Sequence, residues 1–275
     1  MKVDRVQIKE AAALLAAARK QRLRISSLPD ACRPRTVKEA HAIQDAVVAA
    51  LQASVGAFKA TAPNPQSPAT DQSSVSASSS PDAPWLITEG VRALILDQTI
   101  YPSPAAVPSN EMPQCGVEGE IAFRFRRDLP PRATPYTRDE ITAAVDAYPA
   151  LEVVSSRFAA PENTTFLERL ADCVSNGGFV YGRGVESWHG LHTANLHVTL
   201  TVNGETVVDQ MGGHPTGDPL AIVIALVEMM RSTGGVIAGQ FVTCGSFTGL
   251  RYLNPGDSCA VNFEGLGEAQ LTFLP

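Results

Sequence analysis

The sequence has few charged residues, few aromatic residues and no long hydrophobic run. Of its 275 residues, 18% are charged and 6% are aromatic, and the formal net charge is −6. Basic residues never extend beyond a pair such as Arg126-Arg127, so the local positive field that nucleic-acid binding requires is missing. The apolar run 220–227 is far shorter than the roughly 20 residues that span a bilayer. We therefore expect neither a nucleic-acid partner nor a membrane partner.

Cysteine is scarce, and its spacing excludes two further classes of protein. The chain has five cysteines and no C-x-x-C pair, which argues against a zinc ribbon and against a disulfide framework. The N-terminus also lacks the order of charge, apolar core and cleavage site that is typical of a signal peptide. We expect a globular protein, because 44% of its residues are hydrophobic and can form a buried core. The scattered cysteines favour a reducing compartment, so we expect that protein in the cytoplasm.

Helical patterns dominate the first 60 residues. Residues 6–24 alternate Ala and Leu with Lys and Arg, which predicts one helix. Thr36 and Glu39 predict a capping box, in which each side chain binds the backbone amide of the other residue, ahead of a second amphipathic helix. Residues 55–60 then look extended and carry the isolated Lys59.

Strand patterns dominate after residue 110. Apolar residues alternate with Glu118, Glu120 and Arg124 over 117–126, which predicts a strand with one apolar face. Asn203-Gly204 predicts a two-residue hairpin. Asp218-Pro219 predicts the start of a helix. Further strands are expected over 240–244, 259–263 and 269–273.

One interruption of this β-rich region is predicted to be helical. Thr137 and Glu140 form a second candidate capping box, and apolar spacing extends the predicted helix to Tyr148. Pro149 should end that helix, because proline cannot continue the hydrogen-bond ladder. A short strand is expected over 151–154.

The chain divides into three regions by composition. A helical region (1–60) is followed by a segment rich in Pro, Ser, Ala and Thr (61–84), and then by a β-rich core (85–275). The middle segment has almost no bulky apolar residue, so we predict a mobile loop there, whether or not it covers a site. Early helices and late strands favour the α+β class with a mixed sheet or barrel-like core.

Three glutamates are the strongest candidates for chemistry. Glu118 and Glu120 share one face of a predicted strand, about 7 Å apart at Cα, and they repel each other unless a cation lies between them. A solvated strand face is the ordinary alternative. Glu152 lies among apolar residues in a predicted core strand, where an ionised carboxylate needs a partner. That partner is either an arginine such as Arg157 or a divalent cation shared by all three. Oxygen-only ligation favours Mg²⁺ or Mn²⁺ over zinc.

Six segments occur in a characteristic order along nearly the whole chain. They are AAALLAAARKQRLRISSLPDACRPRTVKEAHAIQDAVVAAL, VGAFKA, VEGEIAF, PALEVVSSRF, LADCVSNGGFVYG and the set TCGSFTG…NPGD…FEGLG. Each segment is a weak signal alone, whereas the ordered set is specific. It resembles the 2-keto-4-pentenoate hydratase / 4-oxalocrotonate decarboxylase family of the fumarylacetoacetate hydrolase superfamily. The resemblance implies a fumarylacetoacetate-hydrolase-like core with N-terminal helices, acting as one catalytic unit.

The resemblance also implies roles for individual residues. The metal ligands would be Glu118, Glu120 and Glu152, and the active-site lysine would be Lys59, whose pKa falls readily on burial. A Pro-Asp element makes Asp82 a second catalytic candidate. Three hydroxyl residues are expected near the substrate: Ser175, Ser246 and Thr248.

The implied function is a metal-dependent hydratase that adds water to a 2-hydroxy-2,4-dienoate to give a 4-hydroxy-2-oxo acid. The implied ligand is a small 2-keto acid, with Mg²⁺ or Mn²⁺, in a homo-oligomer that degrades aromatic compounds. Two alternatives are a 2-keto acid decarboxylase of the 4-oxalocrotonate or oxaloacetate type, and an inactive ligand-binding relative. The inactive relative is motivated by Ser155, which stands where the family usually has Asp, and by the unusual residues after Lys59.

Overall fold

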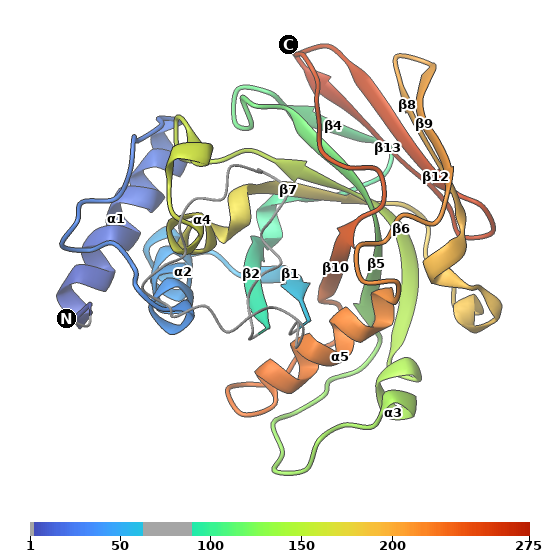
Figure 1. Ribbon diagram of the computed structural model, residues 1–275, viewed down its shortest axis with the longest axis horizontal. Coiled ribbons are helices and arrows are strands. Elements are labelled where there is room, and N and C mark those ends of the chain that lie inside the picture. The colour runs from blue at the N-terminus through green and yellow to red at the C-terminus, as the bar shows by residue number, and fades with distance from the viewer. Residues whose placement is uncertain (1–2, 63–89) are drawn as a thin grey trace.

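The computed structural model describes residues 3–62 and 90–275, and it belongs to the expected α+β class (Figure 1). Most of the predicted mobile loop, 61–84, therefore lies outside the described residues, and so does Asp82. Within the described residues, the chain forms two β-sheets, and helices pack on the larger one. None of these helices is both long and apolar enough to cross a bilayer.

The α-helices cover one end and one side of the larger sheet (Figure 1). α1 and α2 pack against each other and, with α4, enclose an apolar cluster of their own. α5 packs on strands of the larger sheet. Over the described residues the helices are α1 (Arg5–Gln21), α2 (Val37–Leu51), α3 (Arg138–Thr142), α4 (Phe166–Ala171) and α5 (Pro219–Met230).

Local signals explain where these helices begin. Asp218 caps α5 with Pro219 in its first turn, and Thr137 and Glu140 form the predicted capping box of α3. The box predicted for α2 is half correct. The Thr36 hydroxyl accepts from the Glu39 N–H, but the Glu39 carboxylate accepts from the backbone N–H groups of Val3 and Arg35 instead. That carboxylate ties the chain before α1 to α2.

The larger sheet has eight strands and mixed pairing. β1 pairs with β10 in parallel, whereas β5 pairs antiparallel with β10 and β6. In spatial order the strands are β2 (Val91–Leu96), β1 (Val55–Thr61), β10 (Phe241–Ser246), β5 (Gly116–Phe125), β6 (Val145–Val154), β7 (Asn176–Tyr181) and β3 (Ile100–Pro102), with β11 (Arg251–Tyr252) beside β5.

This sheet curls, and its two faces have different partners. β2 contacts β7, although four strands separate them in the sheet order. The concave face carries small residues such as Ala122 and Ala150, which pack with Phe179 and Phe241. Because side chains alternate along a strand, Glu118 and Glu120 share this concave face with Ala122.

The convex face of the larger sheet packs on a second sheet of five strands. Val117, Ile121 and Phe123 of β5 enter one apolar core with residues of β12 and β13. The second sheet consists, in spatial order, of β4 (Ala105–Pro108), β13 (Gly267–Leu274), β12 (Ser258–Phe263), β8 (His197–Val202) and β9 (Glu205–Met211). The predicted hairpin joins β8 to β9, with both Asn203 and Gly204 at positive φ.

The predicted helix up to Tyr148 is wrong beyond its first turns. α3 ends at Thr142, and β6 starts at Val145 and runs through Pro149. Ten residue pairs with β5 outweigh the local helical spacing. Pro149 has no N–H to donate, but its carbonyl accepts a hydrogen bond from the Gly182 N–H, at 2.8 Å.

Gly182, directly after β7, lies close to the backbone of β13 in the second sheet. A Cβ atom there would collide with the Glu268 carbonyl oxygen and lie 2.8 Å from Pro149 Cγ. Gly182→Ala should lower the free energy of unfolding by about 1–3 kcal/mol in urea melts. Gly190→Ala is the control, because nothing lies within 4 Å of its Cβ position, and it should change stability by less than about 0.5 kcal/mol. Equal effects of the two variants would refute the close approach.

Candidate metal centre

Four charged side chains meet on the concave face of the larger sheet. Lys59 comes from β1, Glu118 and Glu120 come from β5, and Glu152 comes from β6. Strand pairing places Glu118 directly opposite Glu152. One carboxylate oxygen from each glutamate lies within 4.8 Å of the others. These four residues are called the charge cluster below.

The charge cluster is largely shielded from water. Glu120 and Glu152 are 0% exposed, and Lys59 is 8% exposed. The Lys59 Nζ atom lies 2.9 Å from Glu152 Oε2 and 3.5 Å from Glu118 Oε2. Three carboxylates and one ammonium group leave a formal charge of −2, which a divalent cation would neutralise.

Burial and mutual repulsion shift the pKa values of the metal-free cluster. Burial raises the pKa of Glu120 well above its ordinary value, and the neighbouring Glu152 and Glu118 raise it further. For Lys59, burial opposes the charged form, but the three carboxylates outweigh burial and raise its pKa. The expectation that burial lowers the pKa of Lys59 is therefore wrong for this state. In the metal-free cluster, the neighbouring carboxylates therefore favour the protonated form of Lys59.

The oxygen atoms of Glu120 test whether a metal ion fits. Its Oε2 accepts from the Gly245 N–H at 2.9 Å. Its Oε1 is fully buried and has no hydrogen-bond partner among the described residues. A buried carboxylate oxygen without a donor is costly, and a cation would relieve that cost. The donor set is oxygen only, which suits Mg²⁺, Mn²⁺ or Ca²⁺ rather than zinc.

The three hydroxyl residues expected near the substrate differ in their positions and hydrogen bonds. Thr248 Oγ1 accepts from the Gly119 N–H at 2.8 Å and contacts the Gly249 carbonyl at 3.2 Å, so it holds β5 between Glu118 and Glu120. Ser246 lies opposite Glu120 in the β10–β5 pairing, and its Oγ is buried without a partner among the described residues. Ser175 lies between α4 and β7, with φ of 59°.

Arg157, one of the two partners that the sequence suggested for Glu152, is not its partner. Arg157 does not contact Glu152; it forms a buried ion pair with Asp172. Lys59 pairs with Glu152 instead, and Asn176 Nδ2 donates to Glu152 Oε1 at 3.0 Å. Sequence reasoning missed Asn176, although it directly follows Ser175 in the LADCVSNGGFVYG segment.

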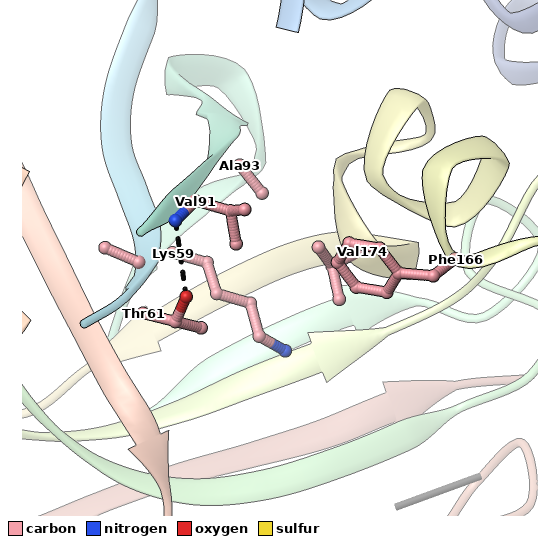
Figure 2. A pocket seen from close by; sticks show the side chains of 7 residues that line it. Lys59, Thr61, Val91, Ala93, Phe166 and Val174 are labelled. Carbon is pink, nitrogen blue, oxygen red and sulfur yellow. Dashed lines mark hydrogen bonds between the residues drawn. The ribbon is translucent and has the colours of Figure 1, made fainter. Parts of the chain in front are cut away.

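A small, partly open cavity adjoins Lys59. Figure 2 shows the Lys59 side chain extending into the space between strands β1 and β2 on one side and Phe166 and Val174 on the other. Thr61 accepts from the Val91 N–H at 3.3 Å and closes one edge. The lining residues are Lys59, Ala60, Thr61, Val91, Ala93, Phe166 and Val174. Lys59 is the single charged member of this set.

Comparison with known proteins identifies the family of the chain. Residues 53–274 match the fumarylacetoacetate (FAA) hydrolase C-terminal family. The chain belongs to the FAA hydrolase family. It is 31% identical over 181 residues to the 2-keto-4-pentenoate hydratase of Paraburkholderia xenovorans (strain LB400), over 65% of this chain and 66% of that protein. It is 31% identical over 139 residues to the 4-oxalocrotonate decarboxylase of Pseudomonas putida, over 49% and 52% of the two chains.

The chain also shares its fold with solved structures. The structure of 4-oxalocrotonate decarboxylase from Pseudomonas putida G7, complexed with magnesium and adipate, superposes with a TM-score of 0.79. The match covers 99% of both chains at 20% sequence identity. The fold and the family resemblance noted in the sequence are both confirmed.

The geometry of the charge cluster makes a prediction about metal binding. Glu120→Gln keeps the shape of the side chain but removes its charge, so Mn²⁺ affinity measured by calorimetry should fall by more than about 100-fold. Glu168→Gln is the matched control, because Glu168 is equally buried but lies on α4 and contacts Leu28 and Thr165. Its metal affinity should not change. Unaltered binding in Glu120→Gln would rule out this centre.

Proposed function

We propose that this chain is a divalent-metal-dependent hydratase that adds water to a 2-hydroxy-2,4-dienoate and forms a 4-hydroxy-2-oxo acid. The observation that carries the proposal is the buried charge cluster, with its formal charge of −2, beside a cavity lined mainly by uncharged residues. The 31% identity to a protein named 2-keto-4-pentenoate hydratase supports the same reaction. Residence in the cytoplasm and assembly into a homo-oligomer stay predictions.

In this proposal Glu118, Glu120 and Glu152 hold Mg²⁺ or Mn²⁺. A divalent ion supplies Lewis-acid polarisation to the carboxylate and 2-oxo oxygens of a 2-keto acid. The orphaned Glu120 Oε1 and the net charge of the cluster support this assignment. Structures of the Pseudomonas putida G7 decarboxylase complexed with magnesium and with calcium concern a protein of the same fold.

Lys59 is proposed as the proton-handling residue. The dienol must lose its 2-hydroxyl proton and gain a proton on carbon before water adds at C4. The carboxylates raise the pKa of Lys59 and keep its amine protonated in the metal-free cluster, and a divalent ion would offset their charge and ease release of that proton to the substrate. Its position between the carboxylates and the cavity gives it access to both. Ser246, with its unpartnered Oγ, is proposed to hydrogen-bond the substrate or the added water. Asp82 and Ser175 stay predictions.

The decarboxylase alternative is disfavoured by the charge of the cavity. 4-Oxalocrotonate carries a second carboxylate at the end away from its 2-keto acid group, and that carboxylate needs a cation. Apart from Lys59, the described residues that line the cavity are uncharged. The sequence from 60 to 91 also contains no Lys, Arg or His. A substrate with an uncharged distal end fits these observations better.

An activity comparison tests the proposed reaction. With Mg²⁺ present, the purified protein should hydrate 2-hydroxypenta-2,4-dienoate, followed by loss of the dienol absorbance and by product analysis. EDTA should abolish turnover, and added Mg²⁺ or Mn²⁺ should restore it. A higher kcat/KM for release of CO₂ from 4-oxalocrotonate would favour the decarboxylase. Intact metal binding without turnover of either compound would favour the inactive relative.

Replacement of Lys59 separates proton handling from metal binding. Lys59→Met removes the cation but keeps most of the side-chain volume, so turnover should fall by about 10²–10⁴-fold. Mn²⁺ affinity should not weaken, because no competing ammonium group remains beside Glu152. Lys38→Met, at an exposed position on α2, is the control and should keep full activity. Normal turnover in Lys59→Met would make Lys59 a bystander.

A further inference from the structure

Asn176, at the start of β7, is held in a defined orientation next to the charge cluster. It is 1% exposed, and its Nδ2 atom donates to Glu152 Oε1 at 3.0 Å and to the Gly178 carbonyl at 3.2 Å. A carbonyl oxygen can only accept, so the amide nitrogen must face Gly178 and the amide cannot be flipped. Its second N–H is thereby directed to Glu152.

Two arginines fix the backbone of Asn176. Its carbonyl oxygen accepts from Arg157 Nη1 at 2.8 Å and from Arg19 Nη2 at 3.0 Å. Arg157 is itself buried, forms an ion pair with Asp172 and donates to the Asp172 carbonyl at 2.7 Å. Charge-assisted hydrogen bonds of this kind are stronger than neutral ones. The position of Asn176 is therefore set by groups on α1 and on the segments before and after α4.

The residues just before Asn176 adopt a conformation that needs such support. Cys173, Val174 and Ser175 have φ values of 54°, 50° and 59°. This left-handed region is unfavourable for residues other than glycine, and most of all for a β-branched residue such as Val174. The run persists because both of its ends are anchored, at Asp172 and at Asn176. It directs Val174 to the cavity and the Asn176 amide to Glu152.

We propose that Asn176 is a positioning residue of the metal centre, which fixes the Glu152 carboxylate so that Oε2 faces Lys59 and the ion. Glu152 is fully buried, so bulk water does not hydrate its carboxylate. Asn176 takes Oε1 and Lys59 takes Oε2, which leaves the carboxylate one orientation. Donors behind a metal ligand commonly set its geometry and affinity. This inference rests on the metal ligation in the proposed function.

The test measures Mn²⁺ affinity by calorimetry in two variants. Asn176→Ala removes the amide, and Asn176→Leu removes the donor but keeps the volume of the side chain. We expect each to weaken Mn²⁺ binding by about 10–100-fold. Because less metal is bound, the kcat for hydration should also fall at sub-saturating Mn²⁺, and it should recover in part at high Mn²⁺. Each variant is assayed below its own melting temperature.

Gln44→Ala is the matched control. Gln44 is also a fully buried amide, with Nε2 hydrogen-bonded to the carbonyls of Leu170 and Arg92 and Oε1 to the Leu94 N–H, but it touches no residue of the charge cluster. It should lower the melting temperature and leave the Mn²⁺ Kd within about twofold of the wild-type value.

The outcomes distinguish this inference from the proposed function. Wild-type affinity in either folded Asn176 variant would overturn the positioning role, as would an equal loss in Gln44→Ala. A wild-type protein that binds Mn²⁺ but does not hydrate the dienoate would refute the reaction while the affinity test of Asn176 still holds. A wild-type protein that binds no divalent ion would overturn both.

Discussion

Three carboxylates, two of them fully buried, can share the inside of a curled sheet only if positive charge lies among them. Glu118, Glu120 and Glu152 would otherwise repel one another in a medium that screens charge poorly. Lys59 supplies one positive charge, and the Gly245 N–H offsets part of another negative charge. The negative charge that remains, together with the Glu120 Oε1 atom that has no hydrogen-bond partner among the described residues, is the physical reason for placing a divalent cation there.

The fold meets this constraint by giving β5 two different faces. Val117, Ile121 and Phe123 bind the strand to the second sheet, so its position does not depend on the charged face. On the concave face, small alanines accommodate Phe179 and Phe241, and the glutamates lie beside them along β5 and β6. Strand pairing with β6 then sets Glu118 opposite Glu152. Stability and chemistry are thus carried by alternate residues of a single strand.

Local patterns in the sequence predicted the features that depend on neighbouring residues. The alternation in β5, the Asn203-Gly204 hairpin and the Asp218 cap are set within a few residues, and all were correct. The extension of β6 through Pro149 was missed, because it depends on pairing with a distant strand. The raised pKa of Lys59 was missed for the same reason, since its carboxylate neighbours come from β5 and β6. Without the family resemblance, no pattern linked Lys59 to the glutamates.

The cavity and the charge cluster share the larger sheet, but one wall of the cavity comes from outside that sheet, which bears on how one fold serves related reactions. The sheet supplies the carboxylates, whereas Phe166 and Val174 lie on and after α4, outside the sheet. Substitutions in that helical segment can change the shape and charge of the cavity without moving β5 or β6. Asn176 joins the two parts, because the backbone run that places Val174 also places the amide on Glu152. Val174 can therefore vary with the shape of the cavity, whereas the hydrogen bond to Glu152 restricts position 176 to a residue that can donate.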